Sequence, residues 1–271
     1  MKTRILVAAI GLPLLLIVVL VLPAVATAIL VAAMCVVAVY ELLVRAGLVR
    51  HVRIFAYSCL MAIAVCIWSW LGLPRAFGMC CVLLYLCGLF IELLVANTEL
   101  KLRTVCFAIF GGLILPYLLS ALVRLRVMDN GRFFILVAFL LTMVPDSGAY
   151  FVGSFFGKHK LCPEISPNKT VEGALGGVAA TILCMLLYTM ILQLAFKFKV
   201  NYLLAVLYGI LGAGASILGD LTFSVIKRQV KIKDYGNLLP GHGGILDRFD
   251  STMVVAPLVE VLLLIAPFAV K

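Results

Sequence analysis

The sequence predicts an all-α, polytopic integral membrane protein. Hydrophobic residues make up 65% of its 271 residues and charged residues only 13%, whereas ordinary soluble domains are about a quarter charged. The apolar runs are long and do not alternate with polar residues, which favours helices over the strands of a closed barrel. Because about 20 apolar residues span the hydrocarbon core as a helix, these runs predict membrane spans.

Nine apolar runs are long enough to be spans, and no soluble domain separates them. Their approximate ranges are 5–22, 24–44, 54–72, 76–97, 104–123, 133–152, 173–195, 202–226 and 251–270. The basic MKTR and the first run resemble a secretory signal, but another apolar run follows directly, so we expect a retained helix. We therefore expect one membrane domain over 1–271, with a helical scaffold in 1–132 and the polar stretches in 133–271.

The lysines and arginines predict the orientation of the spans. Basic residues gather in cytoplasmic loops and beside anionic lipid, which explains the net charge of +10 better than nucleic-acid binding does. With the N-terminus in the cytoplasm, cytoplasmic segments hold 15 of the 22 lysines and arginines. We therefore expect the two polar stretches of the second half, 153–172 and 227–250, at the cytoplasmic surface.

The first polar stretch follows Asp146, at the end of a predicted span. Three glycines in 148–157 would let the backbone approach a ligand or another helix closely, and we expect a helix to restart near Thr170. Hydroxyls and lysines beside a helix N-terminus suit a phosphate, and a basic, solvated loop beside anionic lipid is an equally good interpretation. The candidate ligand-binding residues are Asp146, Ser147, Tyr150, Lys158, Ser166, Lys169, Thr170 and Glu172.

The second polar stretch follows Asp220, near the end of another predicted span. If that helix continues, Ser224 and Lys227 lie on the same face as Asp220. Asp220 and Asp247, with several lysines and arginines, suit phosphoryl or nucleotidyl transfer, because carboxylates hold Mg²⁺ and cations offset phosphate charge. In the alternative interpretation, both aspartates are structural partners of Lys227 and Arg248.

Three glutamates, Glu41, Glu92 and Glu260, also lie within or beside predicted spans. A carboxylate at membrane depth needs a partner or a watery cavity. For each we expect interfacial placement or a structural pair with a nearby arginine. Zinc chemistry is disfavoured, because the chain has three histidines and none stands at the spacing of a metal pair.

The segment from Ser224 to Asp250 resembles the signature of the phosphatidate cytidylyltransferases, also called CDP-diglyceride synthases. The pattern is S-x-hydrophobic-K-R, then K-D-x-small, then P-x-H-G-G-hydrophobic-x-D-R-hydrophobic-D. Its fixed positions are Ser224, Lys227, Arg228, Lys233, Asp234, Gly236, Pro240, His242, Gly243, Gly244, Asp247, Arg248 and Asp250. The upstream segments DSGAYFVGSFFGKHKL and ISPNKTVEG also look like the family. One departure is Phe223, where the family usually has glutamate.

The resemblance implies transfer of the cytidylyl group of CTP to phosphatidic acid, giving CDP-diacylglycerol and pyrophosphate. It implies that 133–271 is the catalytic half, and that Asp220 and Asp247 hold Mg²⁺, with or without a second, monovalent cation. The implied catalytic contacts to CTP or lipid phosphates are Lys169, Lys227 and Arg228. The other implied substrate-binding residues of the signature are Ser224, Lys233, His242, Gly243, Gly244, Arg248 and Asp250.

The implied location is a bacterial-type inner membrane, with the site at the cytoplasmic ends of the C-terminal helices and lipid around the protein. Exposed membrane faces are compatible with a homodimer. Two other functions stay open. A CTP-dependent polyprenol or lipid kinase would release CDP instead of pyrophosphate. A transporter would use buried carboxylates and broken helices, although the polar groups here cluster on one side and not at the midplane.

Overall fold

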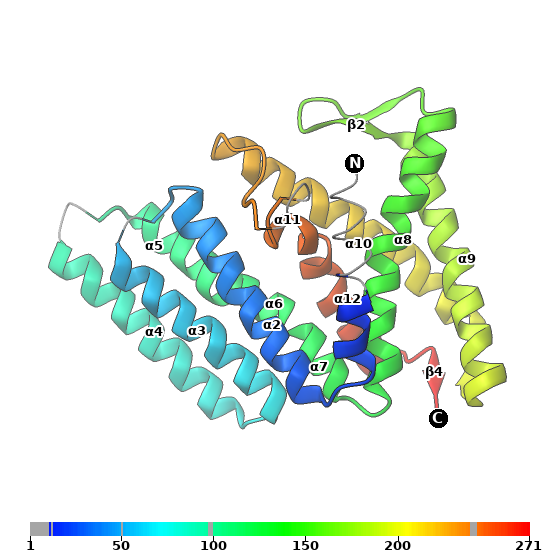
Figure 1. Cartoon of the computed structure of the whole chain (residues 1–271), viewed down its shortest axis with the longest axis horizontal. Coiled ribbons are helices and arrows are strands. Elements are labelled where there is room, and N and C mark those ends of the chain that lie inside the picture. The colour runs from blue at the N-terminus through cyan, green and yellow to red at the C-terminus, as the bar shows by residue number, and fades with distance from the viewer. Residues whose placement is uncertain (1–10, 12, 50, 97–99, 239–242) are drawn as a thin grey trace. The chain divides into compact units, whose positions relative to one another are not determined.

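The computed structural model of the chain describes residues 11, 13–49, 51–96, 100–238 and 243–271 (Figure 1). Helices dominate this part of the chain. Seven helical stretches in it are long and apolar enough to cross a membrane, and they cover Ala24–Arg45, Val52–Leu71, Arg75–Ala96, Leu102–Val127, Gly131–Phe156, Val171–Phe196 and Tyr202–Gln229. The chain is therefore an integral membrane protein, as its composition predicts.

Seven of the nine predicted spans coincide with these helices. The first predicted span, 5–22, lies partly outside the described residues, within which 13–20 are helical. The last, 251–270, is shorter than predicted, because helix α12 covers only the 14 residues Thr252–Ile265. At 1.5 Å per residue such a helix is about 21 Å long, which is less than the hydrocarbon core of about 30 Å. The chain beyond it forms strand β4 (Ala269–Val270).

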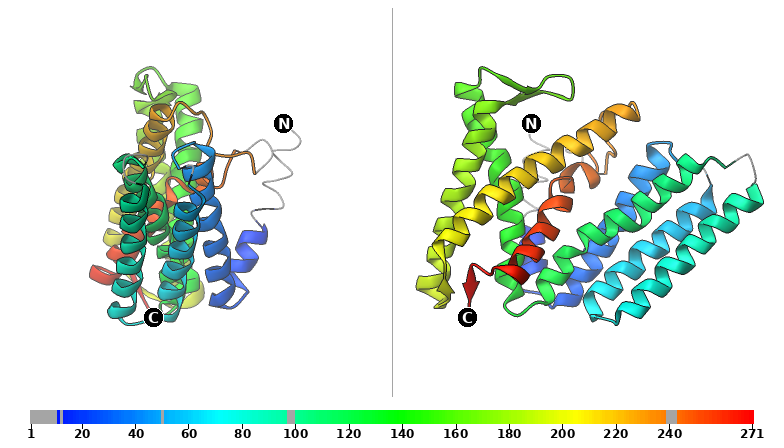
Figure 2. Two further views of the ribbon diagram at one scale, coloured as in Figure 1. Left: turned by 90° about the vertical axis from the view of Figure 1, so that its left-hand side faces the viewer. Right: turned by 180° about the vertical axis from the view of Figure 1, so that it is seen from behind.

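The chain divides into two compact units, the first formed by 1–128 with 232–249 and the second by 129–231 with 250–271. Within the first unit, α3 contacts α2, and α3 and α4 lie side by side (Figure 2). The span Leu102–Val127 consists of several shorter helical segments. The elements are α2 (Ala24–Val39), the π-helix η1 (Tyr40–Arg45), α3 (Val52–Leu71), α4 (Arg75–Ala96), α5 (Leu102–Ile109), the π-helix η2 (Phe110–Ile114), α6 (Leu115–Leu119), α7 (Ala121–Val127) and α11 (Leu246–Phe249).

The second unit contains the long helices of the C-terminal half, and in it α8 and α9 pack along each other (Figures 1 and 2). An antiparallel hairpin of β1 and β2 connects them, and β3 pairs with β4. The elements are α8 (Gly131–Phe156), β1 (Lys160–Cys162), β2 (Ser166–Thr170), α9 (Val171–Phe196), β3 (Lys199–Val200), α10 (Tyr202–Gln229) and α12. The all-α prediction missed these short strands. Pro163 and Pro167 prevent a helix through the hairpin, so its backbone groups pair across strands instead.

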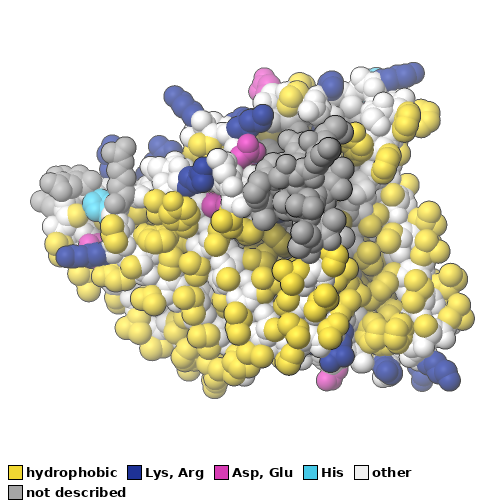
Figure 3. Space-filling model, viewed as in Figure 1, with side chains coloured by type: hydrophobic (Ala, Val, Ile, Leu, Met, Phe, Trp, Pro, Cys, Tyr) yellow, Lys and Arg dark blue, Asp and Glu magenta, His cyan; other side chains and the backbone are white. Residues whose placement is uncertain are grey.

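Hydrophobic side chains cover much of the visible helical surface, while lysines and arginines gather near helix ends (Figure 3). Many large apolar side chains are exposed, among them Leu94 on α4 and Leu203 on α10. In water, such extensive apolar exposure would favour aggregation or association. In a bilayer it is the surface that contacts lipid, because lipid tails are as apolar as the side chains.

Small residues allow α8 and α9 to approach closely, which is one of the two alternatives that the glycines of 148–157 suggested. A Cβ added at Gly148 would lie 2.8 Å from the Cβ of Ala180. A Cβ added at Gly177 would lie 2.7 Å from the carbonyl oxygen of Pro145. Such backbone contact is a common way of packing helices in membranes, and here it supports the hairpin at the ends of the two helices.

Gly177→Ala should therefore destabilise the protein, by about 1–3 kcal/mol, the usual cost of overpacking. The Pro145 carbonyl belongs to the backbone of α8 and cannot rotate away from the added methyl group. The midpoint of thermal unfolding in detergent would measure the effect. Gly214→Ala on α10 is the matched control, because an added Cβ there meets nothing within 4 Å and alanine is the better helix former. Equal unfolding temperatures for the two variants would contradict the packing argument.

Candidate active site

Lys169 and Asp220 form an ion pair in the second unit. Lys169 lies near the end of β2, and Asp220 lies on α10. Their side chains are 26% and 25% exposed, so the pair is shielded but still reachable from solvent. The structure thus brings together Lys169 of the first polar stretch and Asp220, the aspartate that precedes the second. An amine beside a carboxylate suits a ligand that carries both phosphates and a cation.

Asp250 adds a carboxyl group to this part of the second unit. It is only 6% exposed, and its Oδ1 accepts a hydrogen bond of 2.7 Å from the Ser251 backbone N–H. Burial, followed by the negative charge of Asp220, raises the pKa of Asp250 to about 7. The charge of Asp146 acts in the same direction, and Lys227 opposes them. These groups share one electrostatic environment, in which a bound cation would stabilise the ionised carboxylates.

Helix α10 continues past Asp220 to Gln229, which meets the condition for placing Ser224 and Lys227 on the face of Asp220. Ser224 and Lys227 therefore lie on the same helix, at the spacing that places them on the face of Asp220. Phe223, which replaces the usual glutamate of the family, is 3% exposed. This position thus contributes an apolar side chain to the packing of α10.

Asp247 organises the glycine turn of the signature within the first unit. Its Oδ2 accepts hydrogen bonds from the backbone N–H groups of Tyr235, at 2.8 Å, and Gly244, at 3.0 Å. Gly243 has a φ of +86°, a conformation that side chains other than glycine rarely adopt. The predicted substrate-binding residue His242 lies outside the described residues.

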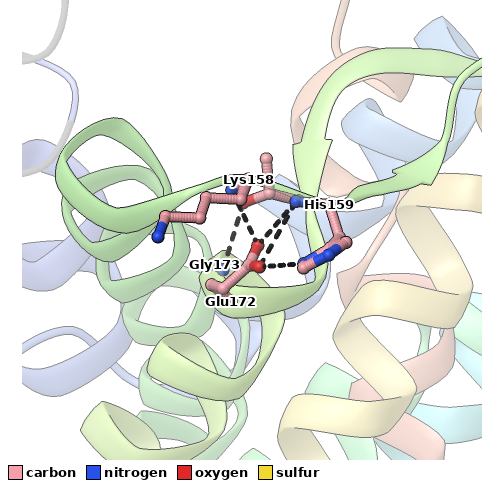
Figure 4. Close-up of polar contacts among 5 residues, drawn as sticks. Lys158, His159, Glu172 and Gly173 are labelled. Carbon is pink, nitrogen blue, oxygen red and sulfur yellow. Dashed lines mark hydrogen bonds and ion pairs between the residues drawn. The ribbon is translucent and has the colours of Figure 1, made fainter.

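Thr170 and Glu172 hold the start of α9 against the hairpin, and Figure 4 shows Glu172 facing Lys158 and His159. Thr170 Oγ1 accepts a hydrogen bond of 3.1 Å from the Gly173 N–H, which caps the helix where the sequence predicts that it restarts. The Glu172 carboxylate accepts hydrogen bonds from the backbone N–H groups of Lys158, at 3.1 Å, and His159, at 3.2 Å. It also contacts His159 Nδ1 at 2.6 Å. These two candidate ligand residues therefore order the hairpin that carries Lys169.

Glu172→Ala should loosen the β1–β2 hairpin, because four polar contacts to one carboxylate are lost together. The backbone amides of Lys158 and His159 should exchange with deuterium several-fold faster, while amides in the middle of α9 keep their protection. Glu164→Ala, an exposed acidic residue of the same hairpin, is the matched control. Unchanged exchange in Glu172→Ala would show that the hairpin is held by other contacts.

The remaining candidate residues lie in more open positions. The Ser147 hydroxyl donates to the Met143 carbonyl of its own helix at 2.9 Å, and Ser166 is half-buried on β2. The exposed candidates are Tyr150, Lys158, Arg228, Lys233 and Arg248. The four lysines and arginines among them are accessible to an anionic ligand from the aqueous phase or the lipid headgroup layer.

The carboxylates of the candidate site suit Mg²⁺ better than a metal that needs a closed protein cage. Across the described ranges, no three histidine, cysteine, aspartate or glutamate side chains are grouped so that they could hold a metal ion. Mg²⁺ usually keeps several waters and binds through one or two carboxylates together with substrate phosphates. Asp220, with acidic neighbours and with lysines for the phosphates, fits that donor set.

Two glutamates at membrane depth have different partners. Glu92 accepts a hydrogen bond from the Tyr57 hydroxyl at 3.3 Å and pairs with Arg53 at 3.5 Å, which confirms the predicted structural pair with an arginine. Glu41 is 2% exposed and accepts hydrogen bonds from the backbone of the signature segment. Sequence reasoning missed this role of Glu41. The available signal was an acidic residue within an apolar run, which does not identify the partner.

An apolar cavity of about 470 Å³ also lies in the first unit, lined by residues of α3, α4 and neighbouring segments. Arg75 is the charged residue of its lining, and the other lining residues are apolar or aromatic side chains and Gly78. A nucleoside triphosphate needs several cationic or metal-binding groups in its binding site. This cavity therefore is not the candidate site for phosphate chemistry.

Comparison with known proteins agrees with the sequence signature. The phosphatidate cytidylyltransferase of Staphylococcus epidermidis is 48% identical over 136 residues, which cover 50% of this chain and 51% of that protein. The phosphatidate cytidylyltransferase of Bacillus subtilis is 42% identical over 157 residues, 58% of this chain and 55% of that protein. The chain thus matches about half the length of these relatives. The model of the cytidylyltransferase family matches residues 2–266, and the chain therefore belongs to this family.

Proposed function

We propose that the protein transfers the cytidylyl group of CTP to phosphatidic acid, producing CDP-diacylglycerol and pyrophosphate. The observation that carries the proposal is the cluster in the second unit, where Lys169 pairs with Asp220 and where Asp250 and Lys227 share the electrostatic environment. The names of the bacterial relatives support the same reaction. An arrangement of carboxylates and amines suits a metal-bound nucleoside triphosphate.

In the proposed mechanism, Lys169, Lys227 and Arg228 bind phosphates and offset their charge. An oxygen of the phosphatidate phosphate attacks the α-phosphorus of CTP and forms a new oxygen–phosphorus bond. The bond from the α-phosphorus to the oxygen that bridges to the β-phosphorus breaks, and pyrophosphate leaves with that electron pair. The side chains contribute mainly by positioning the two anions and stabilising the developing charge.

Asp220 and Asp247 would hold Mg²⁺ in this proposal, as the sequence resemblance implies. When bound, Mg²⁺ neutralises the triphosphate and the leaving pyrophosphate. The Lys169–Asp220 ion pair then gains a specific role. With Asp220 holding a cation, the Lys169 amine would be available to bind a phosphate, so nucleotide and metal binding should be cooperative.

We place the site at the cytoplasmic face of a bacterial-type inner membrane. The basic bias of the predicted cytoplasmic loops supports this orientation. CTP would then arrive from the cytoplasm and phosphatidate from the inner leaflet. The exposed lysines and arginines near the polar stretches would favour both anions.

The decisive experiment is a product assay on purified protein in detergent with labelled CTP, phosphatidate and Mg²⁺. Release of pyrophosphate together with CDP-diacylglycerol is expected, and chelation of divalent cations should stop it. Release of CDP with a phosphorylated lipid would instead show a CTP-dependent kinase. Absence of both products from folded protein, across lipids and metals, would refute the proposal. Flux of an ion or metabolite across sealed vesicles that contain the protein, in the absence of CTP, would indicate a transporter.

A further inference from the structure

We propose that Glu41 is a positioning residue for the signature segment, here the described residues 235–238 and 243–249. Glu41 belongs to the N-terminal half, which the sequence marks only as a helical scaffold. In the structure its carboxylate fixes the backbone that leads directly into Asp247. The inference rests on the proposed function, since it assigns to Glu41 the support of a residue that the reaction would use.

The hydrogen bonds of Glu41 are the first observation. Oε1 accepts from the backbone N–H of Ile245 at 3.1 Å, and Oε2 accepts from the N–H of Leu246 at 2.9 Å. The side chain is 2% exposed. A buried carboxylate needs hydrogen bonds from its surroundings, and here both oxygens obtain them from two consecutive amides. If either N–H turned toward another acceptor, the buried Glu41 carboxylate would lose one of these hydrogen bonds.

The space around the carboxylate is the second observation. A Cβ added at Gly236 or Gly244 would overlap the carboxylate of Glu41. The small residue after K-D-x and the second glycine of H-G-G are therefore explained by the volume that Glu41 occupies. The signature segment folds around this side chain, and glycine at both positions leaves room for it.

Arg45 of the same π-helix also lies beside this segment. The Asn237 side chain lies beside Arg45. With its amide turned so that the oxygen faces the guanidinium, Arg45 would donate to that oxygen at 3.0 Å and the amide nitrogen would donate to the Gly236 carbonyl at 2.7 Å. Glu41 and Arg45 both lie in η1. Single π-helical turns within α-helices are often found at functional sites. Here the turn presents an acceptor and a donor to one segment that is distant in sequence.

These hydrogen bonds affect the orientation of the Asp247 side chain. Leu246 is bonded to Glu41 and immediately precedes Asp247, whose Oδ2 accepts from Tyr235 and Gly244. Glu41 therefore fixes the main chain on one side of Asp247, and the turn fixes its carboxylate on the other. Loss of Glu41 should leave the chemistry of Asp247 unchanged and widen the range of its orientations.

The test combines Glu41→Gln, Glu41→Ala and the matched control Glu92→Gln. Glu92 is a glutamate of the same unit whose described partners are Tyr57 and Arg53. Both Glu41 variants should increase deuterium exchange at the amides of Ile245 and Leu246, with little change in α8 and α9. They should also lower activity or apparent Mg²⁺ affinity about 10- to 100-fold, the usual effect of losing a group that orients a metal ligand. Glu92→Gln should change neither reading.

Glu41→Gln is nearly isosteric and keeps one oxygen acceptor, so it decides the question even if Glu41→Ala does not fold. Normal exchange at Ile245 and Leu246 in Glu41→Gln, with a normal Mg²⁺ requirement, would overturn the inference. Gly236→Ala should reproduce the effects of Glu41→Gln, because the added methyl group displaces the carboxylate. A wild-type protein without cytidylyl transfer would refute the proposed function separately, while the exchange measurement would still decide whether Glu41 positions the segment.

Discussion

Asp220→Asn should abolish cytidylyl transfer and leave the protein folded. Asparagine has the shape of aspartate, so α10 and its packing are preserved, but the charge that pairs with Lys169 is removed. Without that charge the site loses a ligand for Mg²⁺ and the partner that holds Lys169 in place. We expect kcat to fall by at least about 100-fold, the scale on which a single stabilising group at a reacting centre acts. Steady-state pyrophosphate release and thermal unfolding of the same preparation would measure the two effects.

A matched variant separates this role from a merely structural ion pair. Asp129→Asn removes an exposed carboxylate just before α8 in the same unit, and it should retain activity. The double variant Lys169→Gln with Asp220→Asn removes both charges of the pair. If the pair only stabilised the fold, the double variant would recover activity relative to Asp220→Asn. An inactive double variant is expected, and near-normal turnover in Asp220→Asn alone would refute the assignment.

Asp247→Asn should also lose activity by at least about 100-fold, and comparison with Asp247→Ala shows why. In the structure, Oδ2 of Asp247 accepts from the N–H groups of Tyr235 and Gly244. The asparagine side chain keeps an oxygen that can accept both hydrogen bonds, so the turn should persist while the charge is lost. Alanine removes the acceptor as well, so the turn should open and the amides of Tyr235 and Gly244 should exchange faster.

Activity and amide exchange report independently on Asp247→Asn and Asp247→Ala. Activity should fall in both variants, whereas faster amide exchange should appear in Asp247→Ala alone. Glu92→Gln is a suitable control, because this carboxylate of the same unit contacts Tyr57 and Arg53 instead of the turn. If Asp247→Asn retained near-normal activity and Asp247→Ala lost it, Asp247 would serve only to shape the turn, and the metal would need other ligands.

Local sequence signals predicted much of the fold. Seven of the nine spans predicted from the apolar runs coincide with helices that could cross a membrane, because membrane crossing depends mainly on length and composition. Thr170 and Glu172 predicted the restart of α9, since an N-cap and an acidic first turn act within a few residues of each other. The continuation of α10 through Lys227 was only a condition for placing Ser224 and Lys227 on the face of Asp220, and the structure meets that condition. The family itself followed from the spacing of the signature, which the match over residues 2–266 supports.

Only the tertiary structure decided which distant residues become partners. The ion pair of Lys169 with Asp220, the shared environment of Asp250 and the contact of Glu41 with Leu246 join segments far apart in the chain. The length of α12 was also not predicted, because an apolar composition is compatible both with a longer helix and with strand β4. Composition and spacing determine where a chain prefers a helix or contact with lipid. Which buried carboxylate accepts which N–H depends on how the folded backbone satisfies every polar group at once.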